Sequence, residues 1–392
     1  MRLKVCGEAM LKVCDETMQP AARMAACRLL LCAVAAAAPL QVPAQVPAQV
    51  NGPFDVEARA RQLAHVDAKF DCPKPQPVVR DIRIDEYYTD KAYSAVDAKR
   101  RKDADRAAEP LHRYAKRVTW LADRALLQRA HRDAVTGCLV RWLGEWADGG
   151  ALLGRVDGPL AEHYRKWTLA SIALAYAGIK PIADIGAQRQ AGIEGWLRRV
   201  AHEMDRYYGT WRRESWNNHA YWQGLAEAAV AVAVNDRRLL DKAVGKYRHA
   251  VAEITADGLL PKEVARKEKA LGYHVFSVAP LVLLAEIGER NGIAMYGLGD
   301  DAIHRLARAV ARGVEDPGTF ERMVGKRQEL DGGGKGWNVA WLEPYLARFP
   351  DPRLEGLLAP HRPVTHEWLG GNLTLHFAGL DAARAVTLAD PR

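Results

Sequence analysis

The sequence predicts an all-α fold, and three observations support this prediction. From about residue 108 onward, apolar residues recur at spacings of three and four, as on one face of a helix. The alternating pattern of half-buried strands is nearly absent. Short segments with Gly, Pro or Asn-Asp separate the periodic stretches, so we expect long helices joined by short loops. Such helices pack as antiparallel neighbours and can curl into a ring or a superhelical stack with a concave surface.

Helical stretches follow one another along most of the chain. The first carries Trp142 and Trp146, and the next carries Trp167. Later helices are expected at about residues 191–208, 218–234, 237–254, 276–291 and 302–313. Helix-breaking residues mark their ends, at Gly149-Gly150, Gly178, Asn235-Asp236, Asp257-Gly258, Asn291-Gly292 and Asp316-Pro317. Residues 72–97 are the exception, because they are Pro-rich and then aromatic; we expect an irregular loop or lid there.

Residues 1–48 do not have the pattern of a folded domain. Basic residues up to Arg28 precede an apolar run from Leu29 to Ala38, and small residues suited to a signal peptidase follow. The run is shorter than the roughly 20 residues that span a bilayer. We therefore expect a signal peptide that starts at Met24, a Pro-rich spacer, and a single domain over residues 49–392 with no membrane span. The protein would then be periplasmic, or secreted.

Export determines how the cysteines are interpreted. Four of the six cysteines would leave with the leader, so the mature chain keeps only Cys72 and Cys138. In an oxidising compartment two cysteines favour one disulfide, and two free thiols are the alternative. A zinc site is disfavoured, because neither a CxxC nor an HExxH spacing occurs.

The balance of charges points to an anionic partner. The formal net charge is +8, and for an exported protein an acidic polysaccharide fits this charge better than nucleic acid does. The basic run Lys99-Arg100-Arg101-Lys102 is followed by Asp103 and Asp105. We therefore interpret that run as a solvated helix face and not as an anion site.

The segment Trp216-Asn217-Asn218-His219-Ala220-Tyr221-Trp222 suits a sugar site. Its aromatic rings offer faces for pyranose stacking, its amides can bind a carboxylate or hydroxyl, and an imidazole titrates near neutrality. The alternative is a helix start, with Asn217 or Asn218 as N-cap and the rings in the core.

A second group of candidate residues lies in Glu263-Val-Ala-Arg266-Lys-Glu-Lys-Ala-Leu-Gly-Tyr273-His274. On a helix, seven steps return Arg266 and Tyr273 to nearly the same direction, with Lys269 between them. The alternative is an exposed basic face with the tyrosine in the core. His, Asn, Arg and Tyr together suit cleavage of a uronic-acid polymer by β-elimination, which needs donors that neutralise the C6 carboxylate, a base for the C5 proton and an acid for O4.

At these residues the chain resembles the periplasmic alginate lyases of polysaccharide lyase family 5, over roughly residues 70–380. The resemblance implies an incomplete α/α barrel, a toroid of antiparallel helix pairs, with a long substrate cleft and a lid near residues 80–97. The motifs that carry it are Asn217-Asn-His-Ala-Tyr-Trp222, the Arg266 to Tyr273 spacing, Arg165-Lys-Trp167, Trp142-Leu-Gly-Glu-Trp-Ala-Asp-Gly-Gly-Ala-Leu-Leu153, Gly313-Val-Glu-Asp-Pro317 and Trp341-Leu-Glu-Pro-Tyr345.

The resemblance also implies roles for single residues. Asn218 and Arg266 would neutralise the carboxylate, and His219 and Tyr273 would transfer protons, with Tyr273 as the acid toward O4. On mannuronate, Tyr273 could serve as both base and acid. Substrate-binding roles fall to Tyr87 and Tyr88 in the lid, to Tyr164, Trp167 and Lys269, and to Trp222 as a stacking ring. Cys72 and Cys138 match a cysteine pair that the family bonds.

We therefore expect a monomeric lyase that cleaves poly-β-D-mannuronate without a metal or an organic cofactor. Two departures from mannuronate-specific relatives keep the polymer open: Lys269 stands where a second Arg is usual, and Trp368-Leu-Gly-Gly-Asn372 replaces a more basic segment. The first alternative is the same chemistry on glucuronan or hyaluronan. The second is a non-catalytic polysaccharide-binding scaffold.

Overall fold

The computed structural model describes residues 49–63, 66, 69–330, 336–387 and 390. The chain divides into two compact units, Met1–Ala48 and Gln49–Arg392, and only the second contains described residues. The predicted signal peptide and most of the spacer lie outside the described residues, so they stay predictions.

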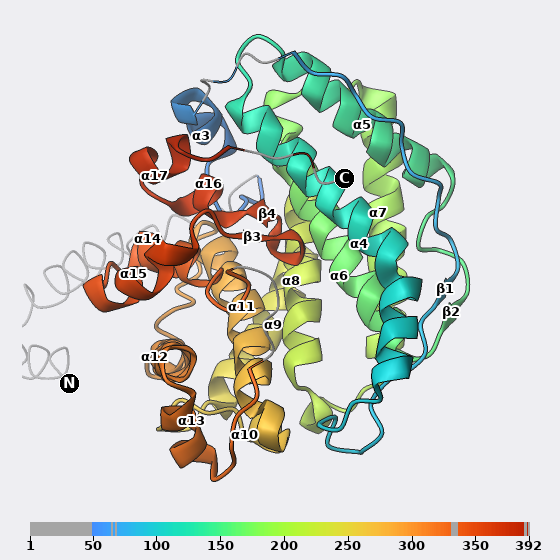
Figure 1. Ribbon diagram of the computed structural model, residues 1–392. Coiled ribbons are helices and arrows are strands. Elements are labelled where there is room, and N and C mark those ends of the chain that lie inside the picture. Colours follow the sequence, from blue (N-terminus) through green and yellow to red (C-terminus); the bar gives the residue numbers. More distant parts are fainter. Residues whose placement is uncertain (1–48, 64–65, 67–68, 331–335, 388–389, 391–392) are drawn as a thin grey trace, which may run out of the picture. The chain divides into compact units, whose positions relative to one another are not determined.

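The regular secondary structure of the second unit is almost entirely helical (Figure 1). The longer ones are α4 (Ala98–Leu127), α5 (Arg132–Asp148), α6 (Pro159–Ala177), α7 (Ala187–Tyr208), α8 (Asn218–Val234), α9 (Arg237–Glu253), α11 (Ala270–Glu289) and α12 (Ala302–Glu315). The shorter ones are α3 (Val56–Leu63), α10 (Pro261–Val264), α13 (Pro317–Val324), α14 (Leu342–Arg348), α15 (Pro352–Leu358), α16 (Leu373–Phe377) and α17 (Leu380–Arg384). The prediction of an all-α fold is confirmed.

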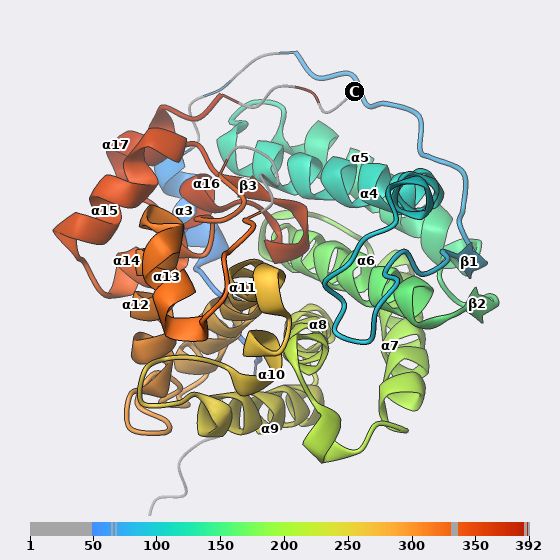
Figure 2. The same ribbon diagram turned by 60° about the horizontal axis from the view of Figure 1, so that its bottom comes forward.

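Inner and outer helices alternate along the chain, as Figure 2 shows. The inner helices α6, α8 and α11 are buried along nearly their whole length, whereas α7, α9 and α12 bury one face. The inner helices pack on one another in the order α4, α6, α8, α11, and α5, α9 and α12 each pack on an inner partner. This is the predicted incomplete α/α toroid. It places the most apolar helices around the wall of a central cavity.

Helix boundaries follow local sequence signals. The side chain of Asn217 caps α8, and Asp236 caps α9, so both helices begin where the sequence predicts. The first inner helix, α4, starts at Ala98 with Asp97 as its cap, ten residues before the apolar periodicity begins. Its first turns are held by exposed ion pairs, Lys99 to Asp103 at 2.9 Å and Arg101 to Asp105 at 3.0 Å. The predicted solvated helix face is confirmed for most of the run, but Arg101 also lines the cavity.

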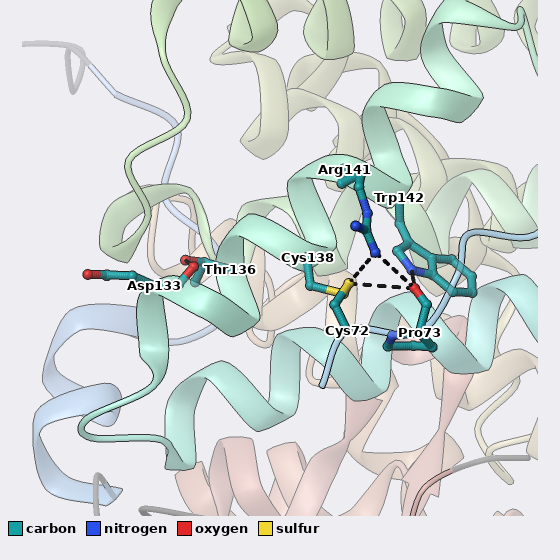
Figure 3. The surroundings of a disulfide bond; sticks show 7 residues. All are labelled: Cys72, Pro73, Asp133, Thr136, Cys138, Arg141 and Trp142. Carbon is teal, nitrogen blue, oxygen red and sulfur yellow. Dashed lines mark hydrogen bonds between the residues drawn. A yellow bond between two sulfur atoms is a disulfide. The ribbon is translucent and has the colours of Figure 1, made fainter. Parts of the chain in front are cut away.

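A disulfide joins Cys72 to Cys138 in α5, as predicted, with 5.6 Å between their Cα atoms (Figure 3). Beside it, the indole Nε1 of Trp142 donates to the Pro73 carbonyl at 3.1 Å. Farther along, β1 (Ile82–Arg83) pairs in parallel with β2 (Val156–Asp157). With the cysteines 66 positions apart in the sequence, the bond adds about 4 kcal/mol in the chain-entropy model. These contacts anchor the segment that leads into the loop at residues 84–97.

One described helical stretch, Lys267–Glu289, is long and apolar enough to cross a membrane. However, 83% of its apolar window is buried inside the fold, which is typical of a core helix. Near the C-terminal end of the described chain, β3 (Thr365–His366) pairs antiparallel with β4 (Gly371–Asn372). The turn between these strands packs against α4, α6 and α11 and presents Trp368 to the cavity.

Candidate active site

A cavity of about 1120 Å³ opens between the inner helices, the loop at 84–97 and the β3–β4 turn. Its lining includes the first turns of α6, α8 and α11, so the positive ends of three helix dipoles meet there. Four basic side chains also line it, from Arg101, Lys116, Arg266 and Lys269. This arrangement favours an anionic ligand.

Carboxylates in the lining are already engaged by other groups. Glu367 lies 3.3 Å from the Nδ1 of His112, Glu329 lies 3.1 Å from the Nζ of Lys269, and an oxygen of Glu86 accepts from two backbone N–H groups. Asp123 is bound by the Nε2 of His376 at 2.6 Å. Their negative charge is therefore partly offset. Among the described residues, no cluster of three or more His, Cys, Asp or Glu side chains could hold a metal ion.

His219 lies in the first turn of α8 and lines the cavity. The side-chain oxygen of Asn217 accepts its backbone N–H at 3.0 Å, so the predicted helix cap and the predicted sugar site coexist in one segment. The imidazole stacks on the ring of His163, with 3.6 Å between centroids and 14° between planes. Burial lowers the pKa of His219 well below its usual value, and the neighbouring His163, Lys166 and Arg266 lower it further. The imidazole is therefore neutral near pH 7.

Arg266 is tied to a buried carboxylate. Its Nε lies 3.4 Å from Glu263, which is 0% exposed, and its Nη1 donates to the Ala92 carbonyl of the loop at 3.3 Å. Asn218 donates to the same carboxylate from its backbone N–H at 2.9 Å and from Nδ2 at 3.0 and 3.1 Å. Glu263 is thus the shared partner of the two residues that were predicted to neutralise a substrate carboxylate.

Two predictions about this group require correction. Asn218 is 0% exposed and does not line the cavity, because its amide faces Glu263; Asn217 lines it instead. Arg266 and Tyr273 do not share one helix. Lys267 has a φ of 56°, a left-handed conformation that interrupts the helical path between α10 and α11. The fold nevertheless brings both to the cavity, with the Arg266 guanidinium 4.9 Å from the Tyr273 ring centroid.

Tyr273 is a protonated phenol. Its hydroxyl donates to the hydroxyl of Tyr88 at 2.9 Å, and the Tyr93 carbonyl lies 3.4 Å away. Burial raises the pKa of Tyr273 well above its usual value, and the adjacent Tyr88 raises it further. Tyr87 and Tyr88 both line the cavity, where the loop at 84–97 covers Tyr273 and Arg266. The placement expected of the two tyrosines is confirmed.

Aromatic rings form much of the remaining wall. Tyr164 and Trp167 line the cavity as predicted, and Trp167 stacks on Trp368 with centroids 4.4 Å apart. The prediction for Trp222 is wrong: it is 0% exposed and lies outside the lining, and its Nε1 donates to the Phe276 carbonyl at 2.9 Å. Trp222 lies about one helical turn after His219, but its side chain points from α8 into the core and not into the cavity. Lys269 lines the cavity as predicted.

Sequence reasoning missed several residues of this site. His163 and Trp368 line the cavity, and Glu263 and Lys166 lie directly behind it. Lys166 lies within the Arg165-Lys-Trp167 motif, His163 precedes that motif by two positions, and Glu263 begins the Arg266 segment, so the titratable residues in and beside each motif were the available signal. Trp368 had drawn notice only as a departure from relatives.

Comparisons with known proteins agree with this architecture. Residues 81–320 match the family model described as "Alginate lyase". A "Polysaccharide lyase" of Stenotrophomonas maltophilia is 37% identical over 317 residues, which cover 80% of this chain and 92% of that protein. An "Alginate lyase" of Pseudomonas fluorescens is 34% identical, over 63% of this chain and 68% of its own length.

Solved structures show the same fold. Alginate lyase A1-III from Sphingomonas species A1 superposes with a TM-score of 0.70 at 24% identity, over 84% of this chain and 97% of its own. A variant of A1-III in complex with a tetrasaccharide gives 0.72 over the same shares. By its sequence, this chain belongs to the alginate lyase family.

Proposed function

We propose that the protein cleaves β-1,4-linked polyuronates by β-elimination, with poly-β-D-mannuronate as the preferred polymer. The observation that carries this proposal is the convergence of a neutral imidazole, a protonated phenol and a clamped guanidinium on one cavity with basic walls. Relatives named alginate lyases support the substrate class, and the tetrasaccharide complex of a structural relative supports binding of a carbohydrate chain.

The proposed reaction needs no water. Arg266 binds the C6 carboxylate and stabilises the charge that develops when the C5 proton leaves; Asn218 acts with it through their shared partner Glu263. A base removes the C5 proton, the C5–H electrons form the C4=C5 bond, the C4–O4 bond breaks, and O4 takes a proton from the Tyr273 hydroxyl. The products are a new reducing end and a 4,5-unsaturated uronate.

The opposite pKa shifts of the two titratable groups favour His219 as base and Tyr273 as acid. H5 and O4 of mannuronate lie on the same face of the ring, so Tyr273 acting at both atoms is the alternative. That alternative starts from a phenolate, which burial disfavours. In His219→Ala, elimination that vanishes at every pH supports His219 as base. Residual elimination that rises steadily with pH would assign both steps to Tyr273.

A second polymer class is favoured by one observation. Lys269 takes the place of an expected Arg, and Glu329 lies 3.1 Å from its Nζ, so part of the cationic wall is neutralised. An outer subsite of this kind suits a polymer with fewer carboxylates per length, such as hyaluronan, or a different uronate, such as glucuronan.

The test is ultraviolet absorbance of the purified residues 49–392 with polymannuronate, polyguluronate, polyglucuronate and hyaluronan in parallel. A C4=C5 bond conjugated to the carboxylate absorbs strongly, and we expect the steepest rise with polymannuronate. A steeper rise with polyglucuronate or hyaluronan would replace the substrate and keep the chemistry. Binding without any rise would sink the lyase proposal in favour of a polysaccharide-binding scaffold.

We also propose that the protein works in the periplasm as a monomer. The disulfide supports an oxidising compartment, and the leader pattern, with Arg23 and Arg28 before the apolar run Leu29–Ala38, supports export. Fractionation of expressing cells would place the cleaved chain in the periplasmic extract. A cytoplasmic chain with two free thiols, or a dimer in light scattering, would contradict this part.

A further inference from the structure

A buried amine lies directly behind His219. Lys166, in α6, is 0% exposed, and its Nζ makes hydrogen bonds of 3.0 Å to the Tyr208 hydroxyl and 3.0 Å to the backbone carbonyl of His219. No carboxylate in the described part of the chain forms an ion pair with it. The acidic residue one turn earlier, Glu162, is instead held by Arg165 at 2.5 Å. An enclosed lysine without a carboxylate is costly and calls for a physical reason.

The other buried lysine next to α8 has an ordinary explanation. Lys246, in α9, lies on the outer side of α8 and binds both oxygens of Glu227, at 2.7 and 2.8 Å. Its charge is matched by a carboxylate that is 0% exposed. Lys166 has no such match, and what it contacts is the backbone and the surroundings of His219.

Tyr208 links Lys166 to His163, the ring that stacks on His219. The Tyr208 hydroxyl lies 2.6 Å from Nδ1 of His163, and His163 stacks on His219. The amine therefore holds the catalytic candidate in two ways. It fixes the carbonyl of His219 in the first turn of α8, and through Tyr208 it fixes the ring on which the imidazole lies.

The basic groups around His219 all oppose protonation of its imidazole. His163 and Lys166 approach from α6, and Arg266 approaches from the turn before α11. Tyr208 of α7 and Asn217 add only neutral groups, and the carboxylate of Glu263 is engaged by Asn218 and Arg266. Burial lowers the pKa of the Lys166 amine well below its usual value, and Glu162 raises it. While that amine keeps its proton, a proton on His219 would add positive charge beside it and Arg266, with no free carboxylate to compensate.

We propose that Lys166 is a positioning residue that holds the His219 imidazole in place and keeps it unprotonated, ready to accept the C5 proton. This inference rests on the proposed function. A structural lysine would only stabilise the fold, whereas this role also sets the pH at which His219 gains a proton.

The experiment compares Lys166→Met with Lys246→Met in residues 49–392. Both changes remove a buried amine beside α8, and only the first touches the His219 network. We expect Lys166→Met to lower kcat about tenfold and to move the acidic limb of the kcat/KM profile up by about one pH unit, because a neighbouring cation no longer opposes protonation. Lys246→Met should lose stability but keep the position of that limb.

Histidine ring signals from ¹⁵N-labelled protein give a readout that does not depend on turnover. The pH at the midpoint of the His219 titration should rise in Lys166→Met and stay unchanged in Lys246→Met. Equal loss of activity at every pH with an unmoved His219 midpoint would overturn the proposal and leave Lys166 a structural residue. If wild type eliminates no polymer, the proposed function fails, but the midpoint still tests the charge effect.

A second variant covers the case in which Lys166→Met does not fold. Tyr208→Phe keeps the ring in place and removes the hydroxyl that joins Lys166 to His163. We expect it to lower kcat more than it changes KM, and to shift the His219 ring signals. Kinetics and signals identical to those of wild type would contradict the proposed network.

Discussion

The two sides of α8 treat buried polar groups differently. On the outer side, Glu227 and Lys246 form a closed pair, and Gln223 donates to the same carboxylate at 2.9 Å. On the cavity side, the ring Nδ1 of His219 and the side-chain oxygen of Asn218 are buried without a hydrogen-bond partner among the described residues. The outer network is complete within the protein, whereas the inner one keeps groups that are not satisfied.

This difference suggests that the outer side of α8 serves stability and the cavity side serves function. A complete buried network stabilises a fold only if every member is present, and loss of one member leaves an uncompensated charge. Groups kept without partners weaken the fold slightly and are common where a ligand or a proton must be received. We therefore expect substitutions on the cavity side to change rates, and substitutions on the outer side to change the free energy of unfolding.

The largest expected effect is that of Tyr273→Phe. It removes the proton that O4 receives, so kcat should fall about 10²- to 10⁴-fold while polymer affinity and the melting temperature change little. Ultraviolet assays, binding by calorimetry and thermal melts measure the three quantities. The matched control is Tyr87→Phe, which removes a hydroxyl from the same wall. A Tyr273→Phe variant with wild-type kcat would show that Tyr273 is not the acid that protonates O4.

On the outer side, Glu227→Gln should act only on stability. It leaves Lys246 buried without its carboxylate, and breaking such a pair costs about 3–5 kcal/mol of unfolding free energy. Denaturant titration measures this loss, and kcat per folded molecule should stay within a factor of two of wild type, roughly. A large drop in kcat at full folding would mean that the outer network reaches the cavity.

Glu263→Gln tests whether a buried carboxylate on the cavity side acts through Arg266. The amide can no longer accept from both Arg266 and Asn218, so the guanidinium loses its fixed orientation and kcat should fall about 10- to 100-fold. Adding Arg266→Ala should then cost little more than Arg266→Ala alone, because the two residues act as a unit.

The control for Glu263→Gln is Glu286→Gln, since Glu286 is also buried and binds Arg348 at 2.8 Å, but outside the cavity lining. Glu286→Gln should reduce stability and keep kcat. Additive effects of the Glu263 and Arg266 substitutions would show that Glu263 does not orient the arginine.

Much of the fold could be predicted from sequence, because helix ends depend on local residues. Asn217, Asp236 and the break at Asn235 set the limits of α8 and α9 where the pattern placed them. Apolar periodicity placed the first long helix only from about residue 108, because the first turns of α4 are stabilised by ion pairs such as Lys99 to Asp103; the charge pattern of residues 99–105 was the signal that the helix begins earlier. The interruption of the helix at Lys267 was missed, because no local sequence pattern predicts a positive φ at a lysine.

The site was less predictable, because its lining depends on the meeting of distant elements. Tyr88 and Tyr273 are hydrogen-bonded although 185 positions separate them, and Trp368 reaches Trp167 only through the β3–β4 turn. Trp222 and Trp167 have similar sequence surroundings, yet one is core and the other lines the cavity. Rotation of each helix about its axis decides this, and it follows from packing across the toroid.

The smallest expected effect concerns acid stability. Burial lowers the pKa of His366 and of His274 to about 4, so the neutral rings contribute stability above pH 6.5 that is lost as the pH falls toward 4. His366 has no hydrogen-bond partner among the described residues, whereas His274 has two, from the Leu260 N–H and to the Ala270 carbonyl.

His366→Phe should therefore flatten the fall in unfolding free energy between pH 6.5 and 4 by about 1–2 kcal/mol and keep stability at pH 7. His274→Phe should lose stability at every pH, because it leaves the buried Leu260 N–H without its acceptor. Thermal melts across this range measure both. An unchanged slope in His366→Phe would mean that this imidazole is not the titrating group.

The central claim is that cleavage proceeds by elimination in the cavity and not by hydrolysis. Mass spectrometry of oligosaccharides released in water enriched in heavy oxygen tests it most directly. The account predicts that each cut gives an unsaturated product one water lighter than a hydrolysis product, with no heavy oxygen incorporated at cleavage, and that Tyr273→Phe releases this product far more slowly. Saturated products that carry heavy oxygen would contradict it.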